Sequence, residues 1–174
     1  GEFELLIPKN TIDKLKTLGL TGEVRIRHSN AMAIFATEDF EICTRLVQGE
    51  YYKYQNMFKE LPLHTVISRK ELLDAMVRAK MCTAEKCPVK FEIAGSQLGL
   101  SIKDQTTDYH ETVDLQENIS EELTIGFDAR LVIETLKAFD CDNVGISLQS
   151  PKMPMIIEAE DSDFKTIVLP VAIK

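Results

Sequence analysis

No stretch of this chain approaches the roughly 18 consecutive apolar residues that a membrane-spanning helix needs. The N-terminus also lacks the basic-then-apolar order of a secretory signal peptide. The four cysteines show no paired framework, which fits a reducing compartment better than a secreted disulfide scaffold. We therefore expect a cytoplasmic protein with four free thiols and no membrane partner.

Arrangements of residues that would carry chemistry are equally scarce. The three histidines are scattered, and no spacing rule joins one of them to a nucleophile. The acidic segment 158–163 lacks the glycine and the terminal glutamate of a calcium loop. Cys82 and Cys87 have no second cysteine pair, so the sequence gives only weak support for a zinc site. We predict no catalytic residue, no metal and no cofactor, and therefore a protein that is not an enzyme.

What the sequence does contain is a repeat with a long, fixed period. Three segments run from an apolar strand into an amphipathic helix: 5–15, 65–75 and 125–135. Ile7, Ile67 and Phe127 hold equivalent places in them, at an interval of 60 residues. A fixed period of this length indicates a repeated supersecondary unit. We predict about three copies of one module, each with a helix packed on antiparallel strands.

The hydrophobic pattern predicts the elements of these modules. Apolar residues at intervals of three or four predict helices at 8–18, 68–80 and 128–139. Alternating segments separated by turn residues at 29–30, 95–96 and 161–163 predict these strands: 23–28, 31–37, 40–47, 89–94, 98–103, 109–115, 144–149, 155–159 and 164–169. The fold class is α+β, with helices laid on one face of a sheet. The aromatic-rich segment 48–63 predicts a connector, with one module before it and two after it.

Positive charge is in deficit over the whole chain but not over the helices. The 20 lysine and arginine residues stand against 28 aspartate and glutamate residues, which ordinarily argues against a nucleic-acid partner. Away from the apolar helix stripes, however, lie six basic residues: Lys9, Lys16, Lys70, Arg78, Arg130 and Lys137. If the modules lie side by side, these faces can follow a phosphate backbone without reading bases. The ordinary alternative is a set of solvated helix faces.

The chain resembles a known family. The repeat, the segment Leu46-Val47-Gln48-Gly49-Glu50-Tyr51-Tyr52-Lys53-Tyr54 and the ending Ile167-Val168-Leu169-Pro170-Val171-Ala172-Ile173 are together similar to the bacterial DNA polymerase III beta subunit, the sliding clamp. In that family, three two-module domains make half of a ring, and two subunits close head to tail around duplex DNA with the helices lining the hole. The resemblance implies a DNA-clamp fold, with residues 1–62 as the second half of the middle domain plus the connector, and residues 63–174 as the C-terminal domain.

The resemblance also implies a groove for partner peptides of Gln-Leu-x-Leu-Phe character. The positions that match this groove are Tyr52, Asn56, Met57, Asp128, Leu131, Lys152, Pro154, Ile167, Val168, Leu169, Pro170, Val171, Ala172 and Ile173. Several are apolar, and methionine adapts readily to varied ligands, so we expect weak and exchangeable binding. Met81 and Cys82 match the family's positions at the interface between ring subunits. An equally good explanation of these two residues is that they pack at the end of the helix.

The function implied is that of a DNA polymerase processivity factor. Such a ring encircles duplex DNA and tethers the replicative polymerase, the clamp loader and other proteins that carry a clamp-binding motif, and it is a homodimer when the subunit is full length. The alternative is a non-catalytic peptide-binding module that shares the fold without encircling DNA. A small hydrolase with an unrecognised site is the weakest hypothesis.

Overall fold

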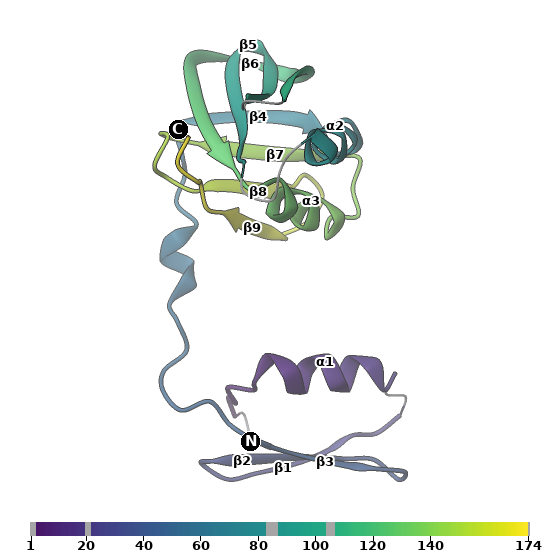
Figure 1. Ribbon diagram of the computed structural model, residues 1–174. Coiled ribbons are helices and arrows are strands. Elements are labelled where there is room, and N and C mark those ends of the chain that lie inside the picture. The colour runs from purple at the N-terminus through teal and green to yellow at the C-terminus, as the bar shows by residue number, and fades with distance from the viewer. Residues whose placement is uncertain (1–2, 20–21, 83–86, 104–106, 174) are drawn as a thin grey trace. The chain divides into compact units, whose positions relative to one another are not determined.

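The computed structural model describes residues 3–19, 22–82, 87–103 and 107–173. The chain divides into two compact units, residues 1–54 and 55–174, and each unit combines helix and sheet (Figure 1). The α+β prediction is therefore correct for both units. Among the helices in the described ranges, none is long and apolar enough to cross a membrane.

The first unit lays one helix on a three-stranded antiparallel sheet. Its elements are α1 (Lys9–Thr17), β1 (Arg25–His28), β2 (Met32–Ala36) and β3 (Glu41–Arg45), with the strands in the order β1-β2-β3. The small apolar centre includes Ala33 and Phe35 of β2. The hydroxyl groups of Thr11 on α1 and Thr44 on β3 share a hydrogen bond of 2.8 Å. This hydrogen bond joins the helix to the sheet.

The strand that we predicted before α1 does not form. Residues 5–7 belong to no sheet, and Leu6 accepts a hydrogen bond from the Val47 amide at 2.8 Å. A strand requires a ladder of such bonds along a neighbouring segment, and β1, β2 and β3 pair with one another instead. Leu5, Leu6 and Ile7 are half-buried, so the apolar pattern of this segment reflects partial burial and not strand pairing.

The second unit is a six-stranded sheet with two helices. Its strands are β4 (Leu63–Ser68), β5 (Val89–Lys103), β6 (Asp108–Phe127), β7 (Asn143–Leu148), β8 (Met155–Ala159) and β9 (Lys165–Val168), in the order β5-β6-β4-β7-β8-β9. Neighbouring strands are antiparallel. The helices α2 (Arg69–Cys82) and α3 (Ala129–Lys137) lie side by side on one face of this sheet (Figure 1). A short 3-10 helix, η1 (Tyr54–Met57), lies within the predicted connector.

The hairpin turn predicted at 95–96 is wrong. Residues 89–103 form one strand, β5, which pairs with β6 on both sides of Gly95, with register shifts between Ile93 and Gln97. Gly95 has a φ of +58°, a conformation that glycine adopts without steric cost, so it accommodates a β-bulge instead of reversing the chain. The strand predicted at 109–115 accordingly continues to Phe127, because its second half pairs with the first half of β5.

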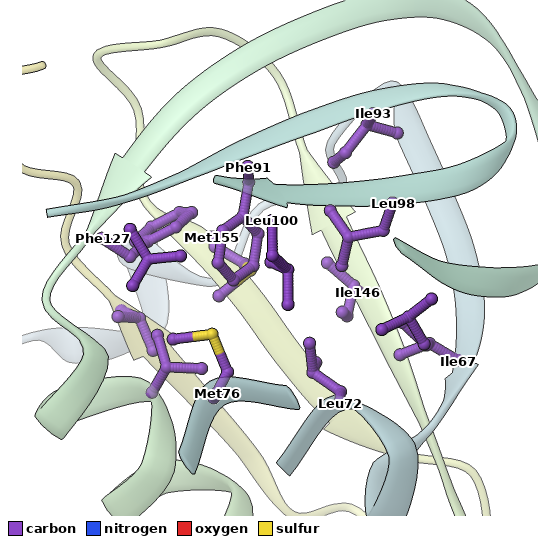
Figure 2. Packing of buried hydrophobic residues seen from close by; sticks show 14 of the residues in the cluster. Ile67, Leu72, Met76, Phe91, Ile93, Leu98, Leu100, Phe127, Ile146 and Met155 are labelled. Carbon is purple, nitrogen blue, oxygen red and sulfur yellow. The ribbon is translucent and has the colours of Figure 1, made fainter. Parts of the chain in front are cut away.

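One apolar core fills the space between the helices and the sheet of the second unit (Figure 2). Leu72 and Met76 point from α2 into this core, where the rings of Phe91 and Phe127 meet edge to face with centroids 5.0 Å apart. All four side chains are fully buried, and each contributes roughly 1.5 to 3 kcal/mol through removal from water. The four cysteines are free thiols. The core thus fixes the positions of α2, α3 and the strand ends that surround the candidate site.

Candidate functional site

The C-terminal segment lies against the end of β6. The Val171 amide donates a hydrogen bond of 2.8 Å to the carbonyl oxygen of Gly126, in an isolated antiparallel bridge beyond β9. The approach is close: a Cβ atom at position 126 would stand 2.7 Å from Cγ1 of Ile173 and 2.8 Å from the carbonyl oxygen of Val171. The end of the chain therefore packs directly on a strand backbone, two residues before the Asp128 that starts α3.

Asp128 is the N-cap of α3. Its carboxylate accepts a hydrogen bond from the Arg130 amide at 2.9 Å and pairs with Nη2 of Arg130 at 2.8 Å. The Arg130 side chain, as the main cause, holds the pKa of the Asp128 carboxyl below its usual value. This cap satisfies a backbone donor that the first turn of a helix leaves free. The predicted groove residue Asp128 thus has a structural task in addition to any contact with a ligand.

Apolar side chains near this point are unusually exposed. Leu131 of α3 is 47% exposed, although Val132 and Leu136 on the same helix are fully buried. Leu169 is 59% exposed, and Val171 and Ile173 at the chain end are also exposed. These four apolar side chains therefore remain in solvent, which is the expected character of a surface that receives apolar groups.

The other predicted groove positions occupy several places. Val168 is buried, Ile167, Pro154 and Pro170 are half-buried, and Lys152 and Ala172 are exposed. The pairing of Met155 with Val168 brings Pro154 next to Leu169. Asn56 and Met57 lie in η1 and are exposed, and Tyr52 is an exposed residue of the first unit. The second unit thus brings together Pro154, Leu169 and the segment that reaches Gly126.

Four of the six predicted DNA-facing cations are already paired with carboxylates. On α1, Lys9 Nζ lies 2.6 Å from Asp13 Oδ2, and on α2, Lys70 Nζ lies 2.8 Å from Asp74 Oδ2. The hydrogen bond to Asp74 is the main cause that raises the pKa of Lys70. Lys16 and Lys137 are exposed and form no ion pair within the part of the chain that the structure describes. The six predicted cations therefore differ in how much charge they present to solvent.

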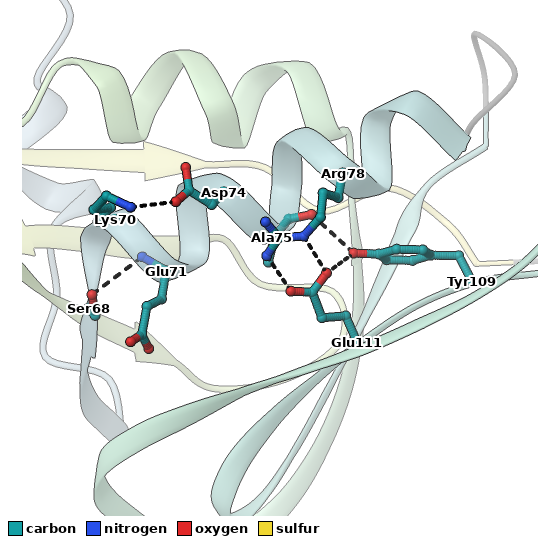
Figure 3. A network of polar contacts seen from close by, with 8 residues as sticks. All are labelled: Ser68, Lys70, Glu71, Asp74, Ala75, Arg78, Tyr109 and Glu111. Carbon is teal, nitrogen blue, oxygen red and sulfur yellow. Dashed lines mark hydrogen bonds and ion pairs between the residues drawn. The ribbon is translucent and has the colours of Figure 1, made fainter.

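Arg78 belongs to a polar network between α2 and β6 (Figure 3). Its Nε donates to Oε2 of Glu111 at 3.0 Å, and its Nη2 donates to the second carboxylate oxygen. The Tyr109 hydroxyl donates to Glu111 and lies 3.3 Å from the carbonyl oxygen of Ala75. The Arg78 hydrogen bonds lower the pKa of Glu111, and burial is the main cause that raises the pKa of Tyr109. Sequence reasoning missed Tyr109 and Glu111, because no local pattern joins them to a helix residue more than 30 positions away.

Met81 and Cys82 stand at the C-terminal end of α2. Met81 is 79% exposed, whereas Cys82 is half-buried and packs against the core. An exposed methionine is adaptable apolar surface, while the cysteine supports the helix end. The two residues that we assigned together to a subunit interface therefore have different surroundings.

A histidine with a serine neighbour lines a separate cavity of about 360 Å³ in the second unit. His64 Nδ1 lies 3.0 Å from Ser147 Oγ, and the same nitrogen lies 3.8 Å from Glu158 Oε1. A catalytic triad uses the two ring nitrogens for different partners, so this geometry does not prepare the serine for attack. Within the described ranges, no group of three or more metal-ligating side chains occurs either. The exposed tail and the helix faces remain the candidate functional surfaces.

The fold and these surfaces define a clamp-type α+β protein built from repeated helix-and-strand modules. Residues 59–172 match the sequence model of the family described as DNA polymerase III beta subunit, C-terminal domain, which covers more than half of the chain. The chain therefore belongs to this family.

Individual relatives agree with this assignment. The chain is 26% identical over 180 residues to the beta sliding clamp of Streptococcus pneumoniae serotype 4, covering 98% of this chain and 47% of that protein. It is similar in structure to a putative DNA polymerase III beta subunit from Eubacterium rectale, with a TM-score of 0.86 and 26% identity over 98% of this chain and 48% of that one. A sliding clamp from Bartonella birtlesii bound to griselimycin has a TM-score of 0.86 and 20% identity, over 97% of this chain and 47% of that one. The chain spans about half the length of the curated relatives it matches.

Proposed function

We propose that this chain is part of a sliding clamp, a non-catalytic processivity factor that encircles duplex DNA and tethers a polymerase to it. The observation that carries the proposal is the family match over residues 59–172. On this proposal, residues 1–62 are the second half of a middle domain with its connector, and residues 63–174 are the C-terminal domain. The clamp loader, the replicative polymerase and other motif-bearing proteins are the partners, and the full-length subunit is a homodimer in the closed ring.

The tail and the start of α3 supply half of a peptide groove on this proposal. The exposed Leu131, Leu169 and Val171 offer apolar surface, and the griselimycin complex of the Bartonella birtlesii clamp supports the presence of a ligand site in the family. Burying roughly 300 Å² of apolar peptide surface would stabilise the complex by roughly 7 to 8 kcal/mol before ordering costs are subtracted. Binding is therefore expected to be weak and exchangeable.

A fluorescence-polarisation titration tests the groove directly. A labelled Gln-Leu-x-Leu-Phe peptide is titrated with this chain and with a matched chain that lacks residues 169–174. Saturable binding that the shortened chain loses would support the groove. If the two chains bind equally well, the tail takes no part and the assignment of the groove fails.

The helix faces would lie along the DNA within the ring. Phosphate contacts that are few and exchange quickly allow sliding, and they make binding depend on salt. Because a ring is retained by topology, the full-length protein loaded on circular duplex DNA should stay bound after dilution and should leave when the circle is cut once. Equal loss from circular and cut DNA would rule out encirclement.

A peptide-binding module that does not encircle DNA is the second candidate. Two observations favour it, the net charge of −8 and the ion pairs that neutralise several of the predicted DNA-facing cations. The two candidates share the groove but differ on the ring. Peptide binding without retention on circular DNA would therefore identify the second candidate.

A further inference from the structure

We infer that Gly126 is a positioning residue for the peptide surface: its missing side chain lets the C-terminal segment, residues 169–173, lie directly on the backbone of β6. The placement of the segment follows from geometry alone, and its consequence for peptide binding rests on the proposed function. Gly126 was not among the residues that the sequence singled out.

Position 126 requires a glycine because the site has no space for a side chain, and not because the backbone there has an unusual conformation. The described glycines with positive φ are Gly19, Gly22, Gly49 and Gly95, and Gly126 is not one of them. Gly126 pairs with Lys90 inside the regular ladder of β5 and β6, where any residue can adopt the backbone angles. An alanine at position 126 would therefore suit the strand itself.

The obstacle to an alanine is the C-terminal segment. A Cβ atom would stand 2.7 Å from Cγ1 of Ile173, which rotation of a side chain can relieve. It would also stand 2.8 Å from the carbonyl oxygen of Val171, whose own amide is bonded to Gly126. A backbone atom held by that bridge cannot move without breaking the bridge. The substitution therefore displaces the segment as a whole.

Displacement would change the surface that a peptide meets. Val168 is buried at the end of β9 and anchors the start of the segment, and the bridge at Val171 holds its middle. Leu169 lies between these two points, and Asp128, which starts the helix carrying Leu131, follows Gly126 by two residues. The position of Leu169 relative to Leu131 thus depends on the bridge.

The test compares Gly126→Ala with Gly145→Ala in the whole chain. Gly145 is a matched control because it is also a buried strand glycine of the second unit, and a Cβ there would stand 3.0 Å from side-chain atoms of His64 and Glu158, which can rotate away. Amide hydrogen exchange measures the bridge at Val171, and the polarisation titration measures peptide affinity. We expect Gly126→Ala to accelerate exchange at Val171 by about tenfold or more and to weaken peptide binding, with both quantities unchanged in Gly145→Ala.

A shortened chain that ends at Leu169 separates displacement from general destabilisation. In it the atoms that oppose the new Cβ are gone, so Gly126→Ala should lower the melting temperature of the whole chain but not that of the shortened one. Equal losses in both lengths, or unchanged exchange at Val171, would overturn the inference. Faster exchange with unchanged peptide affinity would overturn its functional half. A wild-type chain that binds no peptide would count against the proposed function, and the exchange comparison would still decide the placement.

Discussion

Arg78 on α2 and Glu111 on β6 form a two-pronged ion pair, and Tyr109 donates a hydrogen bond to the same carboxylate. The pair joins a helix to a long strand, and the hydrogen bond from the Tyr109 hydroxyl to the carbonyl oxygen of Ala75 links the same two elements. The ion pair also neutralises a cation that we expected to face DNA phosphates. The same two residues therefore bear on the stability of the unit and on the charge of the helix face.

Replacing Glu111 by glutamine should lower stability in a pH-dependent way. Arg78 lowers the pKa of Glu111 in the folded protein, so the carboxylate stabilises the fold above its unfolded pKa of 4.5, and this contribution is lost as the pH falls through the lower folded value. We expect Glu111→Gln to lose about 1 kcal/mol at neutral pH, since the pair is partly exposed to solvent. The acid slope of stability, measured by urea unfolding between about pH 5 and pH 3, should become flatter.

Glu117→Gln is the matched control for that measurement. Glu117 is an exposed residue of the same strand and forms no ion pair among the described residues. Its replacement should leave both the stability and the acid slope close to those of the wild type. A Glu111→Gln variant with the wild-type acid slope would mean that the ion pair does not contribute to folding.

The paired and unpaired lysines should differ in their effect on DNA binding by a full-length ring. Lys16 and Lys137 have no carboxylate partner in the described ranges, whereas Lys9 and Lys70 each have one within the same helix. An unpaired cation releases counterions fully on meeting a phosphate, so each loss should reduce the salt slope of log K by about 1. We expect the double variant of Lys16 and Lys137 to glutamine to flatten the salt dependence more than that of Lys9 and Lys70. Equal slopes would mean that intrahelical pairing is irrelevant on DNA.

The sequence predicted the repeated modules and the helices because these depend on local periodicity. The helix predicted at 128–139 is α3 at Ala129–Lys137, and the strand predicted at 155–159 is β8 with the same bounds. The errors arose where long-range pairing overrides a local signal. Gly95 has the composition of a turn, yet both flanking segments find the same partner strand, so the chain continues through a bulge.

The candidate site was predictable only in part for the same reason. The exposed Leu131 and the terminal strand were found through the resemblance to a family. The contact between Gly126 and Val171 joins residues 45 positions apart, and no sequence pattern announces it. Ion pairs such as that of Arg78 with Glu111 cannot be predicted from the sequence either, because a charged residue does not indicate which residue on a distant strand is its partner.

Truncation of two leucines of α3, Leu131 and Leu136, should affect different properties of the protein. Leu136 is fully buried in the core, and Leu136→Ala should cost about 2 to 5 kcal/mol because it removes apolar contacts and leaves a cavity. Leu131 is 47% exposed, and Leu131→Ala should change stability by less than about 0.5 kcal/mol while weakening the binding of a Gln-Leu-x-Leu-Phe peptide. Urea unfolding and fluorescence polarisation measure the two effects. Unchanged peptide affinity in a folded Leu131→Ala chain would remove Leu131 from the groove.

Two substitutions should separate the helix-capping role of Asp128 from the effect of its negative charge. Asp128→Ala removes the acceptor for the Arg130 amide and should destabilise the fold by about 1 kcal/mol. Asp128→Asn keeps a capping oxygen, so it should retain most of the stability. It loses the negative charge that pairs with the Arg130 side chain. If Asp128 also contacts the peptide as an anion, both variants should bind it more weakly, although only the alanine variant unfolds more easily. Equal peptide affinity for the wild type and the asparagine variant would restrict Asp128 to its role as a helix cap.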